Sequence, residues 1–339
     1  MRALLLLTTT AICFAAEPCR TATEACLELI PIANNLKIAA YRSHSLSTAQ
    51  PNLERAVIVV HGTNRDADRY YTDLVAAAEK AGAIEKTLLI SPYFRGKDRG
   101  CDDKVAAGEL YFTCNGWKYG DSAVNAKDIY SFTVTDRLVR MLADRAKFPK
   151  LRAVVVVGHS AGGQFLQRYA AGTRIDTQVR VRVRFVVMNP SSYMYLDAKR
   201  LPKGATCSEN GTCTGPFQVE SAAEGCPSYN QYRYGIENLA GYLGRTTGGE
   251  IRKRFPKKDV VYLVGEKDVD RNDPSLDKSC ESMKQGAFRR ERGTIFWNYM
   301  KSLYKAGHGF GIAPGCAHNG GCMLASGPGL RALFDSGAK

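Results

Sequence analysis

Apolar runs of strand length alternate with longer amphipathic segments along most of the chain. The runs at 56–60, 151–157 and 260–264 are almost continuously apolar and rich in valine, a pattern typical of strands buried on both faces. Strands are predicted at 36–42, 56–60, 87–91, 151–157, 181–188, 260–264 and 310–313, and helices at 66–81, 128–147, 161–171, 286–305 and 329–335. This alternation predicts an α/β fold with a mostly parallel sheet and helices on both faces.

The alternation stops between about 190 and 250, where the chain is rich in Gly, Ser, Cys and Tyr. A chain of 339 residues is long enough for one large core and a substantial insertion. We therefore expect a single catalytic domain over 17–339, with a cap inserted at about 190–250.

The N-terminus carries the pattern of a secretory signal peptide. Arg2 precedes a short apolar run, and the small residues Ala15 and Ala16 stand before Glu17. The alternative, an uncleaved membrane anchor, would need a longer apolar run to span a bilayer. We expect residues 1–16 to be removed and the protein to be secreted or periplasmic, with no stable membrane anchor.

Eleven cysteines are present, and Cys13 falls within the expected signal peptide. The mature chain then keeps ten, and an even number in an exported protein favours disulfides. Pairing by proximity along the chain predicts Cys19–Cys26, Cys101–Cys114, Cys207–Cys213, Cys226–Cys280 and Cys316–Cys322.

The formal net charge is +14 at pH 7, and losing Arg2 with the signal peptide makes it +13. Such a balance could favour contact with anionic polymers, acidic cell walls or negatively charged substrates. The alternative is that scattered lysines and arginines only keep the protein in solution. No basic run is interleaved with aromatic residues, so no nucleic-acid partner is expected.

The most informative stretch is Gly158-His159-Ser160-Ala161-Gly162, a G-x-S-x-G motif between a predicted buried strand and a predicted helix. A serine at such a sharp turn adopts a strained backbone conformation, and the flanking glycines let neighbouring backbone approach closely. The N-terminus of the following helix favours negative charge beside the serine. The motif therefore predicts a nucleophile rather than a structural turn.

With this motif the chain resembles the α/β-hydrolase superfamily, in particular secreted carboxylesterases and lipases, from about residue 36 onward. The resemblance implies a triad in the order nucleophile, acid, histidine. The acid follows the strand at 260–264, in a G-x-x-D pattern that ends at Asp268. Asp270 and Asp273 are the alternatives in the same loop. The acid's role is to fix the imidazole tautomer and stabilise the imidazolium.

Five histidines compete for the role of base, namely His44, His61, His159, His308 and His318. Parallel strands present their carboxyl ends on one side of a sheet, where the serine lies. His318 leaves the last predicted strand on that side, whereas His308 enters it on the other, so we expect His318. Its spacing from Cys316 and Cys322 could suit a metal, but a disulfide is favoured in an oxidising compartment. Neither a metal nor a cofactor is expected.

The resemblance also implies an oxyanion hole made by two backbone amides. One belongs to Ala161, after the nucleophile, and the other to Thr63 in an HG-x turn, with Asn64 as the second choice. Asn64, Trp117 and Tyr193 are expected to contact substrate.

The predicted function is that of a secreted serine hydrolase that cleaves carboxylic esters, either small molecules or polymers. The same fold could instead serve a peptidase, thioesterase or acyltransferase. A non-catalytic binding protein on the same scaffold is the third alternative.

Overall fold

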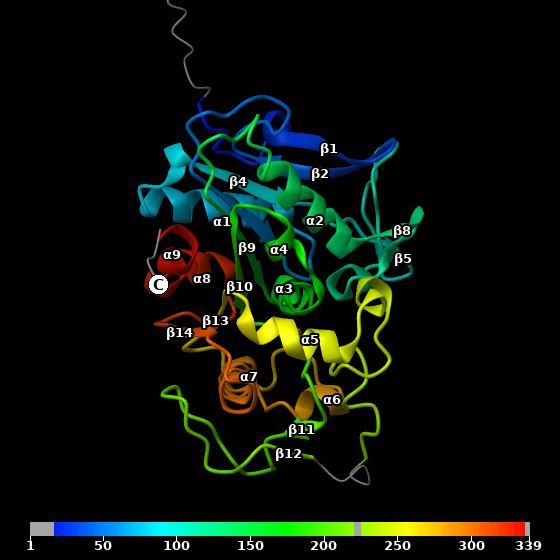
Figure 1. Ribbon diagram of the computed structural model, residues 1–339, viewed down its shortest axis with the longest axis vertical. Coiled ribbons are helices and arrows are strands. Elements are labelled where there is room, and N and C mark those ends of the chain that lie inside the picture. The colour runs from blue at the N-terminus through cyan, green and yellow to red at the C-terminus, as the bar shows by residue number, and fades with distance from the viewer. Residues whose placement is uncertain (1–16, 220–224, 336–339) are drawn as a thin grey trace, which may run out of the picture.

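Figure 1 shows the computed structural model of the chain, which describes residues 17–219 and 225–335. The predicted signal peptide, 1–16, lies outside the described residues. A central sheet of eight strands has the order β1-β2-β4-β3-β9-β10-β13-β14. Its strands are β1 (Leu27–Ala33), β2 (Leu36–Arg42), β3 (Arg55–Val60), β4 (Thr87–Pro92), β9 (Ala153–His159), β10 (Arg182–Met188), β13 (Val260–Gly265) and β14 (Gly309–Ala313).

The six strands from β4 to β14 pair in parallel, while β1 and β2 extend the sheet antiparallel at one edge. The predicted α/β class with a mostly parallel sheet is confirmed. Strand β1 was not predicted, because Pro31 interrupts its alternation. Proline is tolerated there because β1 is an edge strand, with a register shift beside the proline.

Alternate residues of the apolar runs belong to two separate cores, one on each face of the sheet. In β9, Val154 and Val156 join one core, and Val155 and Val157 join the other. The first core is covered by α2 (Ser131–Leu142), α3 (Ala161–Gly172) and α7 (Arg289–Tyr304), and the second by α1 (Ala67–Lys80), α8 (Gly320–Ala325) and α9 (Gly327–Phe334). Continuous apolar strands thus have both faces buried, as the sequence pattern predicted.

The remaining elements are short and lie in the connections. The short helices are α4 (Ile175–Gln178), α5 (Gly248–Arg254), α6 (Cys280–Met283), η1 (Glu24–Cys26), η2 (Ile84–Lys86), η3 (Gly116–Tyr119), η4 (Gly241–Arg245) and η5 (Phe255–Lys257). The two-stranded ribbons pair β5 (Lys97–Asp98) with β6 (Cys101–Asp102), β7 (Ser122–Ala123) with β8 (Ala126–Tyr130), and β11 (Lys199–Arg200) with β12 (Gln218–Val219). In Figure 1, β11 and β12 lie at the end of the molecule opposite β1. The described parts of 190–250 therefore hold little regular structure, as their composition indicated.

Five disulfides cross-link the described chain, and they are the five pairs predicted from proximity: Cys19–Cys26, Cys101–Cys114, Cys207–Cys213, Cys226–Cys280 and Cys316–Cys322. Four of them join cysteines 6 to 13 residues apart and so close short loops. The remaining one, Cys226–Cys280, joins the insertion to the start of α6, which follows β13 in the chain. None of the helices within 17–219 and 225–335 is both long and apolar enough to cross a bilayer.

Candidate active site

Ser160 stands at the turn between β9 and α3, with φ 58° and ψ −119°. A positive φ is costly for a residue with a side chain, so the surrounding structure must hold this conformation. The Ser160 N–H donates to the Met188 carbonyl at 3.0 Å, which attaches the turn to the neighbouring strand β10. This strained turn lifts the serine hydroxyl above the carboxyl ends of the strands.

The glycines of the motif are required by backbone packing. A Cβ at Gly158 would lie 2.1 Å from the Gly162 carbonyl oxygen, and one at Gly162 would lie 2.2 Å from the Val60 carbonyl oxygen. A Cβ at Gly163 would lie 2.5 Å from the Met188 carbonyl oxygen. Each obstacle is backbone and cannot rotate away, so α3 can approach β3, β9 and β10 this closely only without side chains at these positions.

His318 links Ser160 to Asp268. Its Nε2 lies 2.9 Å from the Ser160 Oγ, and its Nδ1 lies 2.8 Å from the Asp268 Oδ2. Asp268 follows β13 and His318 follows β14, so parallel pairing brings both to the side of the sheet that bears Ser160. With the proton on Nδ1, the imidazole donates to the carboxylate and Nε2 can accept the hydroxyl proton. The structure therefore assembles the three side chains into one hydrogen-bonded relay.

The rival residues lie elsewhere. His308 is buried between the Phe255 carbonyl and the Tyr262 hydroxyl, and burial lowers its pKa to about 4. Asp270 accepts the N–H of a residue two positions along the same loop. Asp273 pairs with an arginine instead of a histidine.

Arg289 is a member of the site that the sequence reasoning missed. Its side chain is fully buried, and its guanidinium lies 3.4 Å from Asp268 and 2.8 Å from Asp273. It also donates to the hydroxyls of Ser191 and Ser275, at 3.2 and 2.8 Å. Burial of Asp273 opposes its ionisation, but hydrogen bonds from Arg289 and Ser275 outweigh this and hold the pKa of Asp273 well below its usual range. Arg289 thus contacts the carboxylate oxygen of Asp268 that the imidazole does not contact.

A signal for this residue was present in the sequence. Three arginines, at 289, 290 and 292, stand at the start of a predicted helix, where the helix dipole disfavours positive charge. Such a placement indicates that other groups hold the cations in place, and for Arg289 these are the carboxylates of Asp268 and Asp273.

The turn that was expected to supply an oxyanion donor is oriented by His61, which is fully buried. His61 Nδ1 lies 3.0 Å from the Gly62 carbonyl oxygen, and its Nε2 accepts the Phe94 N–H at 3.0 Å. The Arg65 N–H donates to the same Gly62 oxygen at 3.1 Å. Because a trans peptide directs its C=O and N–H to opposite sides, fixing the Gly62 oxygen also fixes the direction of the Thr63 N–H.

Two cavities meet at Ser160 and share Thr63 and Ser275 in their walls. The first, of about 180 Å³, contains His318. The second, of about 270 Å³, contains Ala161, whose N–H has no intrahelical acceptor because it is the first residue of α3. The first cavity is further lined by Gly62, Asn64, Asp66, Arg69, Tyr70, Asp73, His159, Asn319 and Gly320. The second is further lined by Lys118, Tyr119, Gln164, Ser191, Tyr234, Leu276 and Asp277.

Of the expected substrate-contacting residues, only Asn64 lines one of these cavities. Trp117 is fully buried, and its indole stacks on Phe94 with ring centroids 5.9 Å apart. Tyr193 is also fully buried and stacks on Phe296 at 4.5 Å. The expectation that these two side chains wall the site is wrong, because large rings gain more by packing in the core than by facing a small polar cavity.

His159, another of the candidate bases, lies beside the relay and not in it. Its ring lies against that of His318, with centroids 4.7 Å apart, and its Nδ1 is 2.8 Å from the Tyr70 hydroxyl. Burial, and next the neighbouring His318, lower the pKa of His159 well below its usual value. A neutral His159 therefore adds no positive charge beside the proposed base.

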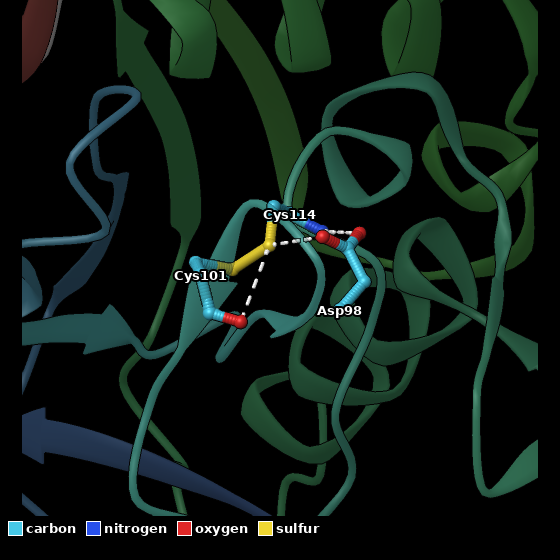
Figure 2. A group of neighbouring side chains, drawn as sticks. All are labelled: Asp98, Cys101 and Cys114. Atoms are coloured by element: carbon cyan, nitrogen blue, oxygen red, sulfur yellow. Dashed lines mark hydrogen bonds between the residues drawn. A yellow bond between two sulfur atoms is a disulfide. The ribbon is translucent and has the colours of Figure 1, made fainter.

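Residue types that bind metals gather at Asp98, Cys101 and Cys114 (Figure 2). The two cysteines form a disulfide, so neither sulfur is a thiolate ligand. The Asp98 carboxylate instead accepts the N–H groups of Gly100 and Cys114, at 2.7 and 2.8 Å. The group is a cross-linked turn, in agreement with the disulfide prediction.

No protein-family model matches the sequence, and a search of curated proteins finds no match either. Solved structures do match. A poly(aspartic acid) hydrolase from Sphingomonas is 18% identical, with a TM-score of 0.62 over 91% of this chain and 98% of that one. A poly(3-hydroxybutyrate) depolymerase from Bordetella parapertussis is 16% identical, with a TM-score of 0.58 over 91% of this chain and 94% of that one. The fold of this chain is the α/β-hydrolase fold.

Proposed function

We propose that the protein is an exported serine hydrolase that cleaves carboxylic esters through an acyl-enzyme on Ser160. The observation that carries the proposal is the His318 imidazole, which lies within hydrogen-bonding distance of both the Ser160 hydroxyl and the Asp268 carboxylate. Nucleophile, base and orienting acid in this arrangement are the recognised requirements for acyl transfer at serine.

In the proposed reaction, His318 Nε2 takes the Ser160 proton as the oxygen attacks the ester carbonyl. The amides of Thr63 and Ala161 donate to the resulting oxyanion, at roughly 3 kcal/mol of transition-state stabilisation each. The imidazolium, stabilised by Asp268, then protonates the alcohol as its C–O bond breaks. Water, deprotonated by the same imidazole, releases the acid and restores the serine.

The two cavities suggest where each half of the substrate lies. The leaving alcohol must receive its proton from the imidazole, which places it in the cavity that contains His318. The acyl part then occupies the cavity beside Ala161. In that cavity Leu276 is the main aliphatic residue in the wall. Burial, and next the nearby Arg168, lower the pKa of Lys118 to about 8, a value at which most of this side chain is still cationic at neutral pH. We therefore expect short or polar acyl groups rather than long alkyl chains.

Hydrolysis of amides is the second candidate. Of the two solved structures described above, one is named for poly(aspartic acid) and the other for poly(3-hydroxybutyrate). The first cavity contains Asp66 and Asp73, whose pKa values are raised by burial. The oxygens of these carboxyl groups would accept hydrogen bonds from the amine that leaves when an amide is cleaved. A thioesterase, an acyltransferase or a non-catalytic binding protein has no comparable support.

Export is part of the proposal. The signal-like residues 1–16 and the five disulfides of the described chain support an extracellular or periplasmic protein. Detection of a mature chain that begins near Glu17, by N-terminal sequencing of the exported protein, would test this.

The catalytic proposal is tested with a fluorophosphonate probe and a substrate series. Wild-type protein should be labelled on Ser160, and Ser160→Ala should lose labelling while it unfolds at the wild-type temperature. Short esters, matched amides and thioesters are then ranked by kcat/KM. A folded wild-type protein that reacts with neither the probe nor any ester would contradict the proposal, and higher kcat/KM on amides would favour the second candidate.

A further inference from the structure

A separate cleft of about 580 Å³ lies between α2 and the segment that carries η4. Gly172, the last residue of α3, forms part of its wall. Because α3 has 12 residues and begins next to Ser160, the cleft is roughly 18 Å from the nucleophile along this helix. It belongs to neither cavity at Ser160 and shares no wall residue with them.

Arginines approach this cleft from three elements. Helix α2 contributes Arg137 and Arg140, which are three residues apart and therefore lie on one side of the helix; Asp136 lines the same cleft. Arg174 follows the end of α3, and Arg245 comes from η4 on the opposing segment. Four arginines and a single aspartate thus line one concave surface.

The aspartate is already satisfied by neutral donors. Its carboxylate accepts the hydroxyls of Tyr169, Thr173 and Tyr242, at 2.8, 2.7 and 2.6 Å. Asp136 is buried beneath the wall and forms no ion pair with the cleft arginines among the described residues. Its charge therefore offsets that of the arginines only in part.

The arginines differ in their partners. Arg174 pairs with Glu250, and Arg140 donates to the side-chain carbonyl of Gln178. Within the described chain, Arg137 and Arg245 have no carboxylate partner, and the guanidinium of Arg245 lies 5.9 Å from the Tyr242 ring centroid. These two are free to bind an anion from opposite walls.

Stabilisation of helix ends explains part of this cluster. Cations beside the C-termini of α2 and α3 interact favourably with the helix dipoles, which accounts for Arg140 and Arg174. It does not account for Arg245, which belongs to a different element and adds charge to the same space. Burial, followed by repulsion from Arg174, lowers the pKa of the adjacent Arg254, which indicates that positive charges are crowded here.

We propose that this cleft binds a small oxyanion ligand with two or more negative groups. Guanidinium groups recognise carboxylate and phosphate oxygens through paired N–H donors, and several of them converge here. The volume is that of a ligand site rather than a flat contact surface. The proposal is independent of the reaction at Ser160.

Binding is measured by calorimetry at low salt, with citrate and with pyrophosphate as separate probes. The full exported chain carrying Ser160→Ala is used, so that turnover does not contribute. We expect one site per chain, and the probe that binds more tightly distinguishes a polycarboxylate from a phosphate ligand. Combining R137Q with R245Q should weaken binding at least about tenfold.

The matched control combines R99Q with K104Q, which removes the same charge from exposed positions outside the cleft. This control should bind within about twofold of the parent, and both variants should unfold at the parent temperature. Three results would overturn the proposal: neither probe binds, the cleft variant binds as tightly as the parent, or the control weakens binding as much as the cleft variant.

Discussion

Replacement of Arg289 by methionine tests whether a buried cation holds the proposed acid in place. The change keeps most of the side-chain volume but removes the charge shared by Asp268 and Asp273. It also removes the donors to Ser191 and Ser275. Asp268, only 3% exposed, would keep His318 as its one ionisable side-chain partner among the described residues.

The expected loss of stability follows from this burial. Breaking a buried ion pair by removing one partner costs about 3–5 kcal/mol, because the remaining charge stays desolvated. The lower figure corresponds to a fall of roughly 6 °C in Tm for a chain of this size. Arg289 stands at 0% side-chain exposure, so no screening by solvent reduces the effect.

The expected kinetic change has two parts. Loss of the acid itself costs about 10⁴-fold in the best-studied triads, and a loosened acid should cost less, about 10- to 10³-fold in kcat/KM. Removing a positive charge also favours proton binding by the Asp268–His318 pair. The acidic limb of the pH profile should therefore move to higher pH.

The assay is kcat/KM for a short ester between pH 5 and 9, together with thermal unfolding. Arg289→Lys should recover part of the rate, because it restores the charge without the full set of donors. Asp273→Asn, which changes another partner of Arg289 but does not contact His318, should lower the rate less than tenfold. Wild-type kcat/KM and an unshifted profile in Arg289→Met would refute the reasoning.

Three further predictions concern the structure around the site. Replacing Cys316 and Cys322 by serine should lower the free energy of unfolding by about 2 kcal/mol in the loop-entropy model. It should also reduce kcat, because His318 lies within the loop that this disulfide closes. Thermal unfolding checks the first effect and an ester assay checks the second. Gly162→Ala should abolish activity or folding, whereas Gly249→Ala, with its nearest contact at 3.8 Å, should be neutral in the same assays. Burial lowers the pKa of His308 to about 4, so this side chain stays neutral in the folded state down to about that pH. In the unfolded chain the same side chain has a pKa of about 6.5 and takes up a proton below that pH. Stability should thus fall by up to about 3 kcal/mol between pH 6.5 and 4, and denaturant titrations should show a smaller fall in His308→Gln.

Local patterns were sufficient to predict the sheet and the nucleophile. Strands β3, β9 and β13 are apolar on both faces, and only a central strand of a covered sheet can bury such a run. The G-x-S-x-G motif lies within a few residues of chain, so its geometry depends on local backbone and glycine sterics. The disulfide pairs were predictable for a similar reason, because four of the five close loops of 6 to 13 residues.

The walls of the site could not be predicted in the same way. Trp117 and Tyr193 stand in loop sequences that look exposed, yet both rings are buried against helices distant in the sequence. Lys118, adjacent to Trp117, lines the second cavity instead. Whether a loop side chain turns inward depends on the shape of the core that receives it, and no local pattern encodes that shape.

The sequence by itself determined the α/β class and the strained serine turn, since these depend on periodicity and on sterics over a few residues. The order of the proposed triad residues came from the resemblance to α/β hydrolases. Tertiary structure alone decided that Arg289 supports Asp268, that His159 lies against His318 and that four arginines share a cleft beside the C-terminal end of α3. The physical reason is distance along the chain. Charges and rings from separate elements affect one another only after the sheet has set their spacing, and a buried charge is stable only where that spacing supplies its partner.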